Sequence, residues 1–191
     1  MMQLNIRLIS IVAIIAALLR NVYSVSSGSS FQLKMYWEDG TEWQESTKER
    51  KHCIECDNDC DEGEKLRIQS CNKGTSRQRF YYSDGKIQSK RNRNVCLTYG
   101  TNLRDEVRLR DCNDDKYEDR QKIGGFKYSG KFQMRPDDDE DKSSSDALCI
   151  TVEHHPRPSE KLEMIRCRTA EKNDSGIKDD SSHWVAGYYN D

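Results

Sequence analysis

The sequence predicts an all-β domain that is stapled by disulfides and built from three copies of a four-strand unit. Three observations support this prediction. A set of short motifs recurs three times along the chain, eight cysteines are spread over the same region, and no helical pattern of normal length follows the N-terminal stretch. Twelve short strands must protect their edges by pairing within one fold, which favours a closed, threefold barrel.

The N-terminal residues have the pattern of a secretory signal. Arg7 supplies a positive charge, Leu8–Leu19 is almost entirely apolar, and Asn21–Ser24 offers the small side chains that a signal peptidase reads. A membrane-spanning helix needs roughly 20 apolar residues, and this run is shorter. We therefore expect a cleaved signal at 1–24 and a short linker at 25–30, although an uncleaved signal-anchor is the alternative. The protein is expected to be secreted, with no membrane span after cleavage.

The composition of the chain favours a fold that depends on disulfides. Apolar and charged residues each make up 34% of the chain, which leaves little material for a large core. An even number of cysteines in an exported chain is typical of a disulfide framework. The net charge is −2 at pH 7, and positive and negative residues alternate. We therefore expect no binding of nucleic acid.

The repeat is clearest around six of the cysteines. The first cysteine of each unit starts a similar tripeptide: Cys53-Ile54-Glu55, Cys96-Leu97-Thr98 and Cys149-Ile150-Thr151. An apolar–polar–apolar triplet precedes the second cysteine of each unit: Leu66-Arg67-Ile68, Val107-Arg108-Leu109 and Leu162-Glu163-Met164. A period of two is typical of a half-buried strand. These strands form the middle of each unit.

Two further motifs frame each unit. The opening motifs are Phe31-Gln32, Ile87-Gln88 and Phe132-Gln133, and the closing motifs are Gln78-Arg79-Phe80, Gln121-Lys122-Ile123 and Ser182-His183-Trp184. Gly85 and Gly130 stand before the second and third units, where a turn is expected. The units therefore run over about 31–84, 85–129 and 130–191, and they differ mainly in the lengths of their loops.

In this order of motifs the chain resembles a divergent ricin B-type lectin. Repeats of that family contain an apolar–Gln strand, Cys-Leu, an alternating strand ending in Cys, and Gln-x-Trp. The resemblance covers nearly all of residues 31–191, and it implies a β-trefoil with pseudo-threefold symmetry. The chain departs from the family in its closing motifs. The Trp position is Phe80, Ile123 or Trp184, and the Gln is kept as Gln78 and Gln121 but becomes Ser182.

The resemblance also implies three of the disulfides, which are Cys53–Cys71, Cys96–Cys112 and Cys149–Cys167. Cys56 and Cys60 are left over, and they can bridge each other in a local loop. A swapped pairing such as Cys56–Cys71 remains open. The spacing of Cys53, Cys56 and Cys60 also superficially suits zinc, but an oxidising compartment favours disulfides. We expect no metal and no cofactor.

A sugar pocket of this family requires a carboxylate two residues after the first cysteine. It also requires an aromatic ring near the second cysteine and an amide before the closing motif. The first unit offers Glu55, Gln69, Arg77 and Gln78 at or beside these places. The equivalents of Glu55, Gln69 and Arg77 are Thr98, Arg110 and Arg120 in the second unit, and Thr151, Ile165 and Ser181 in the third. No unit has the ring in place, although Trp37, Trp43, Tyr81 and Tyr82 are candidates.

These residues predict a secreted carbohydrate-binding protein with degenerate sites, and its partners would be glycans or glycoproteins. The alternative is a β-trefoil scaffold that binds a protein partner through loop insertions such as the one containing Trp37 and Trp43. No catalytic group of residues is apparent, and the chain is not expected to be an enzyme. Asn173-Asp174-Ser175 is a possible N-glycosylation site.

The reduced protein is expected to be largely unfolded. A disulfide that closes a long loop contributes roughly 3 kcal/mol, so three of them supply about 9 kcal/mol of a typical stability of roughly 5–15 kcal/mol. Far-UV circular dichroism with and without reductant measures the effect. An unchanged spectrum after complete reduction would contradict the expectation.

Overall fold

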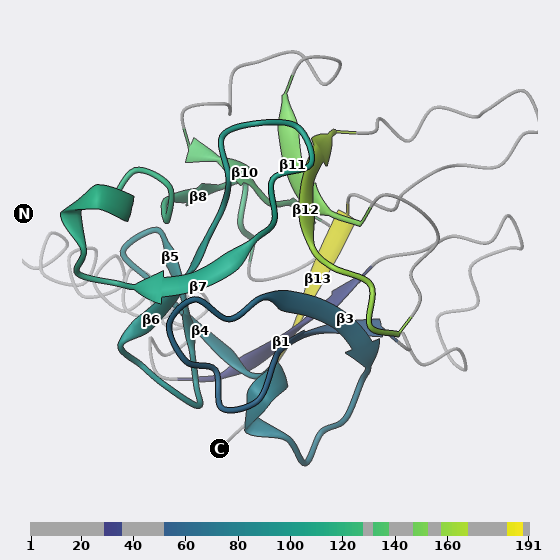
Figure 1. Ribbon diagram of the computed structural model, residues 1–191. Helices are drawn as coiled ribbons and strands as arrows, with labels where there is room; N and C mark the ends of the chain where they lie inside the picture. Colours follow the sequence, from purple (N-terminus) through teal and green to yellow (C-terminus); the bar gives the residue numbers. More distant parts are fainter. Residues whose placement is uncertain are drawn as a thin grey trace, which may run out of the picture.

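The computed structural model describes residues 29–35, 52–127, 132–137, 147–152, 158–167 and 183–188 (Figure 1). The expected signal at 1–24 lies outside these residues, as do Trp37, Trp43 and Asn173. The same holds for Gly130, Ser181 and Ser182.

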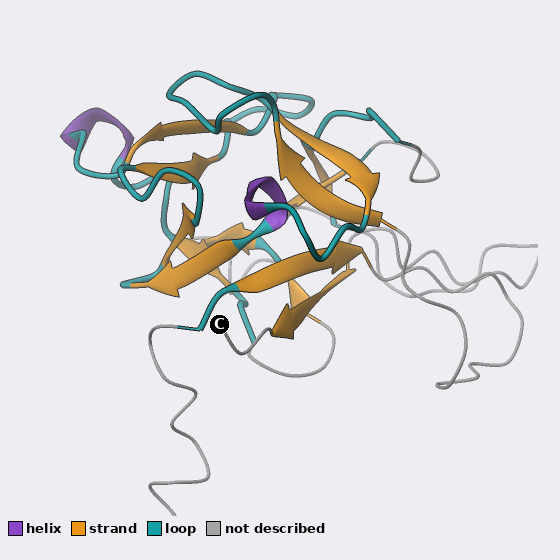
Figure 2. Ribbon diagram, turned by 90° about the horizontal axis from the view of Figure 1, so that it is seen from below, coloured by secondary structure: helices purple, strands orange, loops and turns teal. Residues whose placement is uncertain are grey.

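Strands make up nearly all of the regular structure, and two short 3-10 helices lie in the loops (Figure 2). The first repeat contains β1 (Phe31–Met35), β2 (His52–Cys56), β3 (Leu66–Ser70), η1 (Ser76–Gln78) and β4 (Phe80–Ser83). The second contains β5 (Lys86–Ser89), β6 (Val95–Thr98), β7 (Arg108–Asp111), η2 (Asp115–Tyr117) and β8 (Ile123–Gly124). The third contains β9 (Phe132–Gln133), β10 (Arg135–Pro136), β11 (Leu148–Thr151), β12 (Glu163–Arg166) and β13 (His183–Tyr188).

The opening and closing strands of the repeats form a barrel. β1 pairs with β4 and with β13, β4 pairs with β5, β13 pairs with β9, and β8 pairs with β10. The amide of Ile123 donates a hydrogen bond to the carbonyl oxygen of Gly85 at 2.8 Å, which joins the start of β8 to the turn before β5. The barrel edges are thereby paired within the molecule.

The middle strands of each repeat form an antiparallel hairpin. β2 pairs with β3, β6 with β7, and β11 with β12, and the two members of each hairpin lie side by side. One face of each hairpin carries the predicted apolar positions. In the first hairpin Leu66 and Ile68 are fully buried, and the intervening Arg67 is half-buried. The period-two prediction is confirmed for these strands.

Three backbone hydrogen bonds form a closed ring where the hairpins meet. The amide of Leu66 donates to the carbonyl oxygen of Val107 at 3.2 Å, that of Val107 donates to Leu162 at 2.9 Å, and that of Leu162 donates to Leu66 at 3.0 Å. These residues hold the same place in the three predicted units. The ring therefore marks the pseudo-threefold axis that the β-trefoil prediction requires.

A second ring surrounds the first. Gly63, Arg104 and Ser159 each lie three residues before a ring residue, and all have a positive φ, of 89°, 70° and 71°. Their amides donate to the carbonyl oxygens of Leu109, Met164 and Ile68 in a neighbouring repeat, at 2.7–2.8 Å. The left-handed conformation favours glycine, and here Arg and Ser adopt it too. The shared conformation turns the chain into each hairpin strand in the same way.

The closing motifs supply the centre of the core. Phe80, Ile123 and Trp184 are each at most 2% exposed. The Trp184 indole nitrogen also donates to the carbonyl oxygen of Ile150 at 2.8 Å, so its polar atom is satisfied inside the protein. The apolar character that these three positions share is therefore required for packing.

Four disulfides reinforce the hairpins, and no cysteine is free. Cys53–Cys71, Cys96–Cys112 and Cys149–Cys167 each link the two strands of one hairpin at its open end. Cys56–Cys60 closes the turn that follows β2. The first three are the pairs that the family resemblance implies, and Cys56–Cys60 is the local bridge expected for the two remaining cysteines. With these four bonds formed, the structure contains neither the swapped pairing nor a zinc site at these cysteines.

A charged cluster lies at the axis. Lys65, Glu106 and Lys161 immediately precede the three ring residues, so they hold equivalent positions. Both lysine Nζ atoms lie 2.7 Å from Oε1 of Glu106, and Arg108 donates to Oε2. The hydrogen bond from Lys161 and then that from Lys65 lower the pKa of Glu106 from 4.5 to about 2. The negative charge of Glu106 therefore joins three positive side chains from all three repeats.

Glu106→Gln removes the negative charge that pairs with both lysines, so it should lower the free energy of unfolding at pH 7. The expected loss is about 1–2 kcal/mol, because the lysine side chains are partly exposed and water weakens their ion pairs with Glu106. A depressed folded-state pKa stabilises the fold above the unfolded value of 4.5, and this stabilisation is lost as the pH falls toward 2. Urea unfolding of the oxidised protein at several pH values measures the difference between Glu and Gln. A difference that stays constant from pH 7 to pH 2 would refute this role.

Candidate functional site

The candidate sugar-site residues of the first unit lie where the β2–β3 hairpin meets the loop containing η1. Glu55 is in β2, Gln69 is in β3, and Arg77 and Gln78 are in η1. The side-chain oxygen of Thr75 accepts a hydrogen bond from the amide of Arg77 and caps η1. The cap fixes the direction in which Arg77 and Gln78 leave the backbone.

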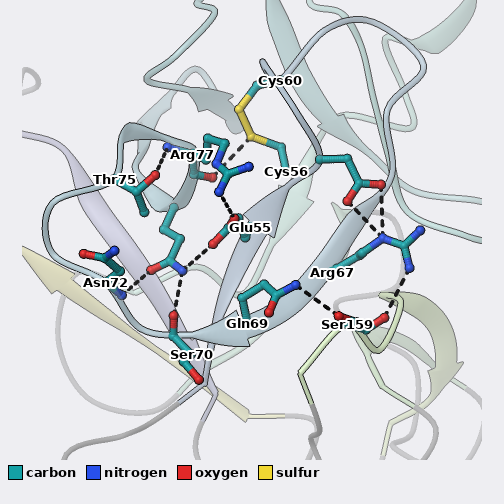
Figure 3. Close-up of polar contacts among 12 residues, drawn as sticks. Glu55, Cys56, Cys60, Arg67, Gln69, Ser70, Asn72, Thr75, Arg77 and Ser159 are labelled. Carbon is teal, nitrogen blue, oxygen red and sulfur yellow. Dashed lines mark hydrogen bonds and ion pairs between the residues drawn. A yellow bond between two sulfur atoms is a disulfide. The ribbon is translucent and has the colours of Figure 1, made fainter.

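Three of these four residues form one network (Figure 3). Oε1 of Glu55 pairs with the Arg77 guanidinium at 2.8 Å, and Oε2 accepts a hydrogen bond from Nε2 of Gln78 at 2.6 Å. The Glu55 side chain is only 13% exposed, whereas that of Arg77 is 43% exposed. Glu55 therefore orients Arg77 toward the surface while its own oxygens are held by protein donors.

Gln78 is fully buried and connects this network to the fold. Its Nε2 also donates to the carbonyl oxygen of Ser70 at 2.8 Å. Its Oε1 accepts from the amide of Asn72 at 2.7 Å and from Nε2 of Gln32 at 2.9 Å. One side chain thus ties together β1, β3 and the η1 loop.

Gln69 is not part of this network. Its Nε2 donates to the hydroxyl of Ser159 in the third repeat at 3.3 Å, and it points away from Glu55 and Arg77 (Figure 3). Gln69 instead helps to join neighbouring repeats. Sequence position alone grouped it with the other three because it stands two residues before the second cysteine.

A polar hollow of about 510 Å³ lies beside Arg77. Its lining contains amide, hydroxyl and charged groups from Asn58, Asp59, Asn72, Gly74, Thr75, Ser76, Arg77 and Arg91. Arg91 reaches it from the second repeat and pairs with Asp59 at 2.6 Å. These donors and acceptors suit a ligand with many hydroxyl groups.

The two candidate tyrosines lie elsewhere. Tyr81 is 7% exposed beneath Arg93, whose guanidinium carbon is 4.3 Å from the ring centre. Tyr82 stacks on Phe126 with ring centres 4.1 Å apart and donates to the carbonyl oxygen of Ile123. Neither ring lines the hollow, so these two residues serve the barrel.

Sequence reasoning missed Asn58, Asp59 and Arg91. They stand in loops outside the repeated motifs, and Arg91 comes from the next repeat. Asp59 belongs to an acid-rich loop after Cys56, and only the fold brings it to Arg91. No pattern in the sequence identifies a contact of this kind.

The second repeat keeps the supporting amide but changes what surrounds it. Nε2 of Gln121 donates to the hydroxyl of Thr98 at 3.2 Å and to the carbonyl oxygen of Asp111 at 2.7 Å. This repeats the contacts of Gln78 with Glu55 and Ser70. In the third repeat Thr151 and Ile165 are buried, at 0% and 8% exposure. The described part of the third repeat therefore offers no exposed polar side chain at these two places.

Among the described residues, no group of three His, Cys, Asp or Glu side chains is arranged to hold a metal ion. No helix within the described ranges is long and apolar enough to cross a membrane.

Residues 44–123 match the family model of the ricin-type β-trefoil lectin domain. This part of the chain is therefore similar to the ricin-type β-trefoil lectin domain. The expected resemblance to that family and the expected β-trefoil fold are confirmed. Domains of that family are typically non-catalytic. A comparison with curated protein sequences gives no match.

Solved structures with this fold include the agglutinin of Abrus precatorius (17% identity, TM-score 0.56, covering 85% of this chain and 49% of that one). The β-trefoil lectin of the Vibrio vulnificus hemolysin/cytolysin, with N-acetyl-D-lactosamine bound, matches at 10% identity and TM-score 0.54, covering 85% and 96%. The C-terminal half of an earthworm R-type lectin, in complex with GalNAc, matches at 10% and 0.53, covering 84% and 99%. This chain spans only 18% of the length of a mosquitocidal holotoxin of similar fold (16% identity, TM-score 0.57).

The supporting glutamines of the lectin domain should differ in their effect on stability. Gln78→Leu leaves buried donors and acceptors around it unsatisfied, and we expect a loss of about 2–4 kcal/mol. Gln121→Leu should cost less, because Oε1 of Gln121 has no hydrogen-bond partner within the described structure. Chemical denaturation of both variants measures the difference. Equal losses would show that the larger network around Gln78 adds nothing to stability.

Proposed function

We propose that the protein is a secreted carbohydrate-binding protein whose first repeat binds a sugar in the hollow beside Arg77. The arrangement that carries this proposal is the exposed Arg77 guanidinium, fixed by Glu55 at 2.8 Å and facing a hollow of amides and hydroxyls. A guanidinium held in one orientation loses little side-chain entropy when it donates to a ligand.

Glu55 has a different role here from the carboxylate of a typical family pocket. Its two oxygens already accept from Arg77 and Gln78, so we propose that it positions Arg77 and that sugar hydroxyls contact Arg77 and the amides around it. Asn58 and Asn72 each supply a donor and an acceptor. The proposed site therefore binds through polar contacts, and weak affinity is expected from one such site.

The four disulfides support the secretion part of the proposal, because structural disulfides persist in oxidising compartments. Glycosylation at Asn173 would require the same export route and stays a prediction.

The test is a glycan-array screen of the oxidised protein, purified from a secreting host, followed by titration with methyl α-galactoside. Galactose-type sugars are suitable first probes, because three proteins with this fold have been solved with N-acetyl-D-lactosamine, α-methyl-D-galactoside or GalNAc bound. We expect Arg77→Gln and Glu55→Ala each to weaken sugar binding by about tenfold, the loss of one charge-assisted contact.

Arg93→Gln is the matched control, since it removes the same charge from a residue that contacts Tyr81 outside the hollow. It should leave the affinity unchanged. Absence of glycan binding, by protein shown to be folded and oxidised, would reject the proposal. The protein-binding scaffold with contacts at Trp37 and Trp43 would then be the leading function.

A further inference from the structure

We propose that the second repeat of the lectin domain contains a separate site for an anionic saccharide, recognised through a sulfate ester or carboxylate by Arg110 and Arg120. The oxyanion part of this proposal is independent of the first-repeat hollow. Only its saccharide part rests on the proposed carbohydrate-binding function.

A pocket of about 430 Å³ lies at the place in the second repeat that corresponds to the candidate sugar site of the first. Four arginines and two acids are among its lining residues, with aromatic, small and polar side chains completing it: Thr98, Tyr99, Gly100, Arg104, Asp105, Glu106, Arg108, Arg110, Tyr117 and Arg120. The excess of positive charge distinguishes this pocket from the hollow of the first repeat.

The charge of Arg120 is uncompensated because one carboxylate is missing. In the first repeat Arg77 is neutralised by Glu55 at 2.8 Å. The equivalents in the second repeat are Arg120 and Thr98, and the Thr98 hydroxyl accepts from Gln121 and donates to the carbonyl oxygen of Cys96. Within the described structure, no carboxylate lies at ion-pair distance from Arg120; its charged group contacts the Tyr117 ring instead.

Two guanidinium groups of the pocket lie against the Tyr117 ring. The guanidinium carbon of Arg120 lies 4.8 Å from the centre of its ring, and that of Arg110 lies 5.3 Å away. Arg110 makes a long ion pair with Glu62, a mostly exposed side chain, at 3.8 Å. Two like charges against one half-buried ring repel each other, and an anion bound in the pocket that both arginines line would reduce the repulsion. Guanidinium groups also match the paired oxygens of sulfate and carboxylate.

The two acids of the pocket do not cancel these charges. Glu106 is bound by Lys65, Lys161 and Arg108, so its negative charge is already more than balanced. Oδ2 of Asp105 accepts from the backbone and side-chain nitrogens of Asn102 at 2.9 and 3.1 Å. Asp105 therefore closes a loop at the pocket wall, and its carboxylate can also accept from a sugar hydroxyl.

The size of the pocket favours an anion that is carried on a sugar. A volume of about 430 Å³ is within the range of small-molecule sites and far exceeds what a free oxyanion fills. Tyr99 and Gly100 complete one wall, and the absence of a side chain at Gly100 allows Asp105 to lie close to it. A Cβ atom at Gly100 would lie 2.0 Å from the Cβ atom of Asp105. The wall thus depends on a glycine at this point.

The experiment titrates the oxidised full-length secreted protein with four probes: galactose 6-sulfate, galacturonic acid, methyl α-galactoside and sodium sulfate. Isothermal titration calorimetry at about 50 mM NaCl keeps screening weak. We expect the better of the two anionic sugars to bind about tenfold or more tightly than methyl α-galactoside, and the comparison of these two sugars separates sulfate ester from carboxylate. Raising the salt concentration should weaken this binding.

Arg110→Gln and Arg120→Gln should each reduce the affinity for the anionic sugar about tenfold, and the charge-matched control Arg93→Gln should not. Thr98→Glu is the reciprocal variant. It supplies the counter-ion that the first repeat has, with Gln121 in place as its hydrogen-bond donor, so it should also abolish the preference for anions. Circular dichroism checks that each variant is folded.

Equal affinity for charged and neutral galactose, or full anion binding by both arginine variants, would overturn the proposal. Sodium sulfate binding as tightly as galactose 6-sulfate would overturn its saccharide part. If the proposed sugar site of the first repeat is wrong, methyl α-galactoside will not bind while the anionic sugars still do. This outcome is therefore distinguishable from failure of the second-repeat site.

Discussion

The ring of backbone hydrogen bonds among Leu66, Val107 and Leu162 is the constraint on which the rest of the β-trefoil depends. Each repeat donates to one neighbour and accepts from the other, so no hairpin can satisfy its own backbone at the axis. Buried backbone groups left without partners are costly. The three repeats must therefore fold together, although their loops differ in length and sequence.

This constraint explains where the chain tolerates variation. Gly63, Arg104 and Ser159 differ chemically but share a left-handed backbone, because the outer ring of hydrogen bonds requires that conformation. Apolar residues of different size occupy the closing motifs, provided that they are buried. Side chains that face solvent beyond the rings are free of this restriction, and there the repeats acquire different charges.

The difference between the first two repeats illustrates this freedom. Gln78 and Gln121 make corresponding contacts and hold the same part of the fold. The residue at one equivalent position beside them is Glu55 in the first repeat and Thr98 in the second. This difference decides whether the neighbouring arginine is neutralised. A single scaffold can therefore present a polar, charge-balanced hollow on one repeat and a cationic pocket on the next. Because sites on different repeats point in different directions, the two need not compete for a ligand.

The sequence by itself determined the fold class, the threefold unit, the positions of the strands and the cysteines that form the framework. Such features rest on local periodicity and on motifs that recur at matched places, as with Leu66-Arg67-Ile68 and its two counterparts. Only the tertiary structure decided which polar side chains meet. It joined Glu55 to Arg77, turned Gln69 to Ser159, brought Arg91 to Asp59, and placed Arg110 and Arg120 against Tyr117. Two of these contacts join different repeats, and the other two bring a hairpin strand to the loop that follows it. Residue spacing carries no record of how these loops approach.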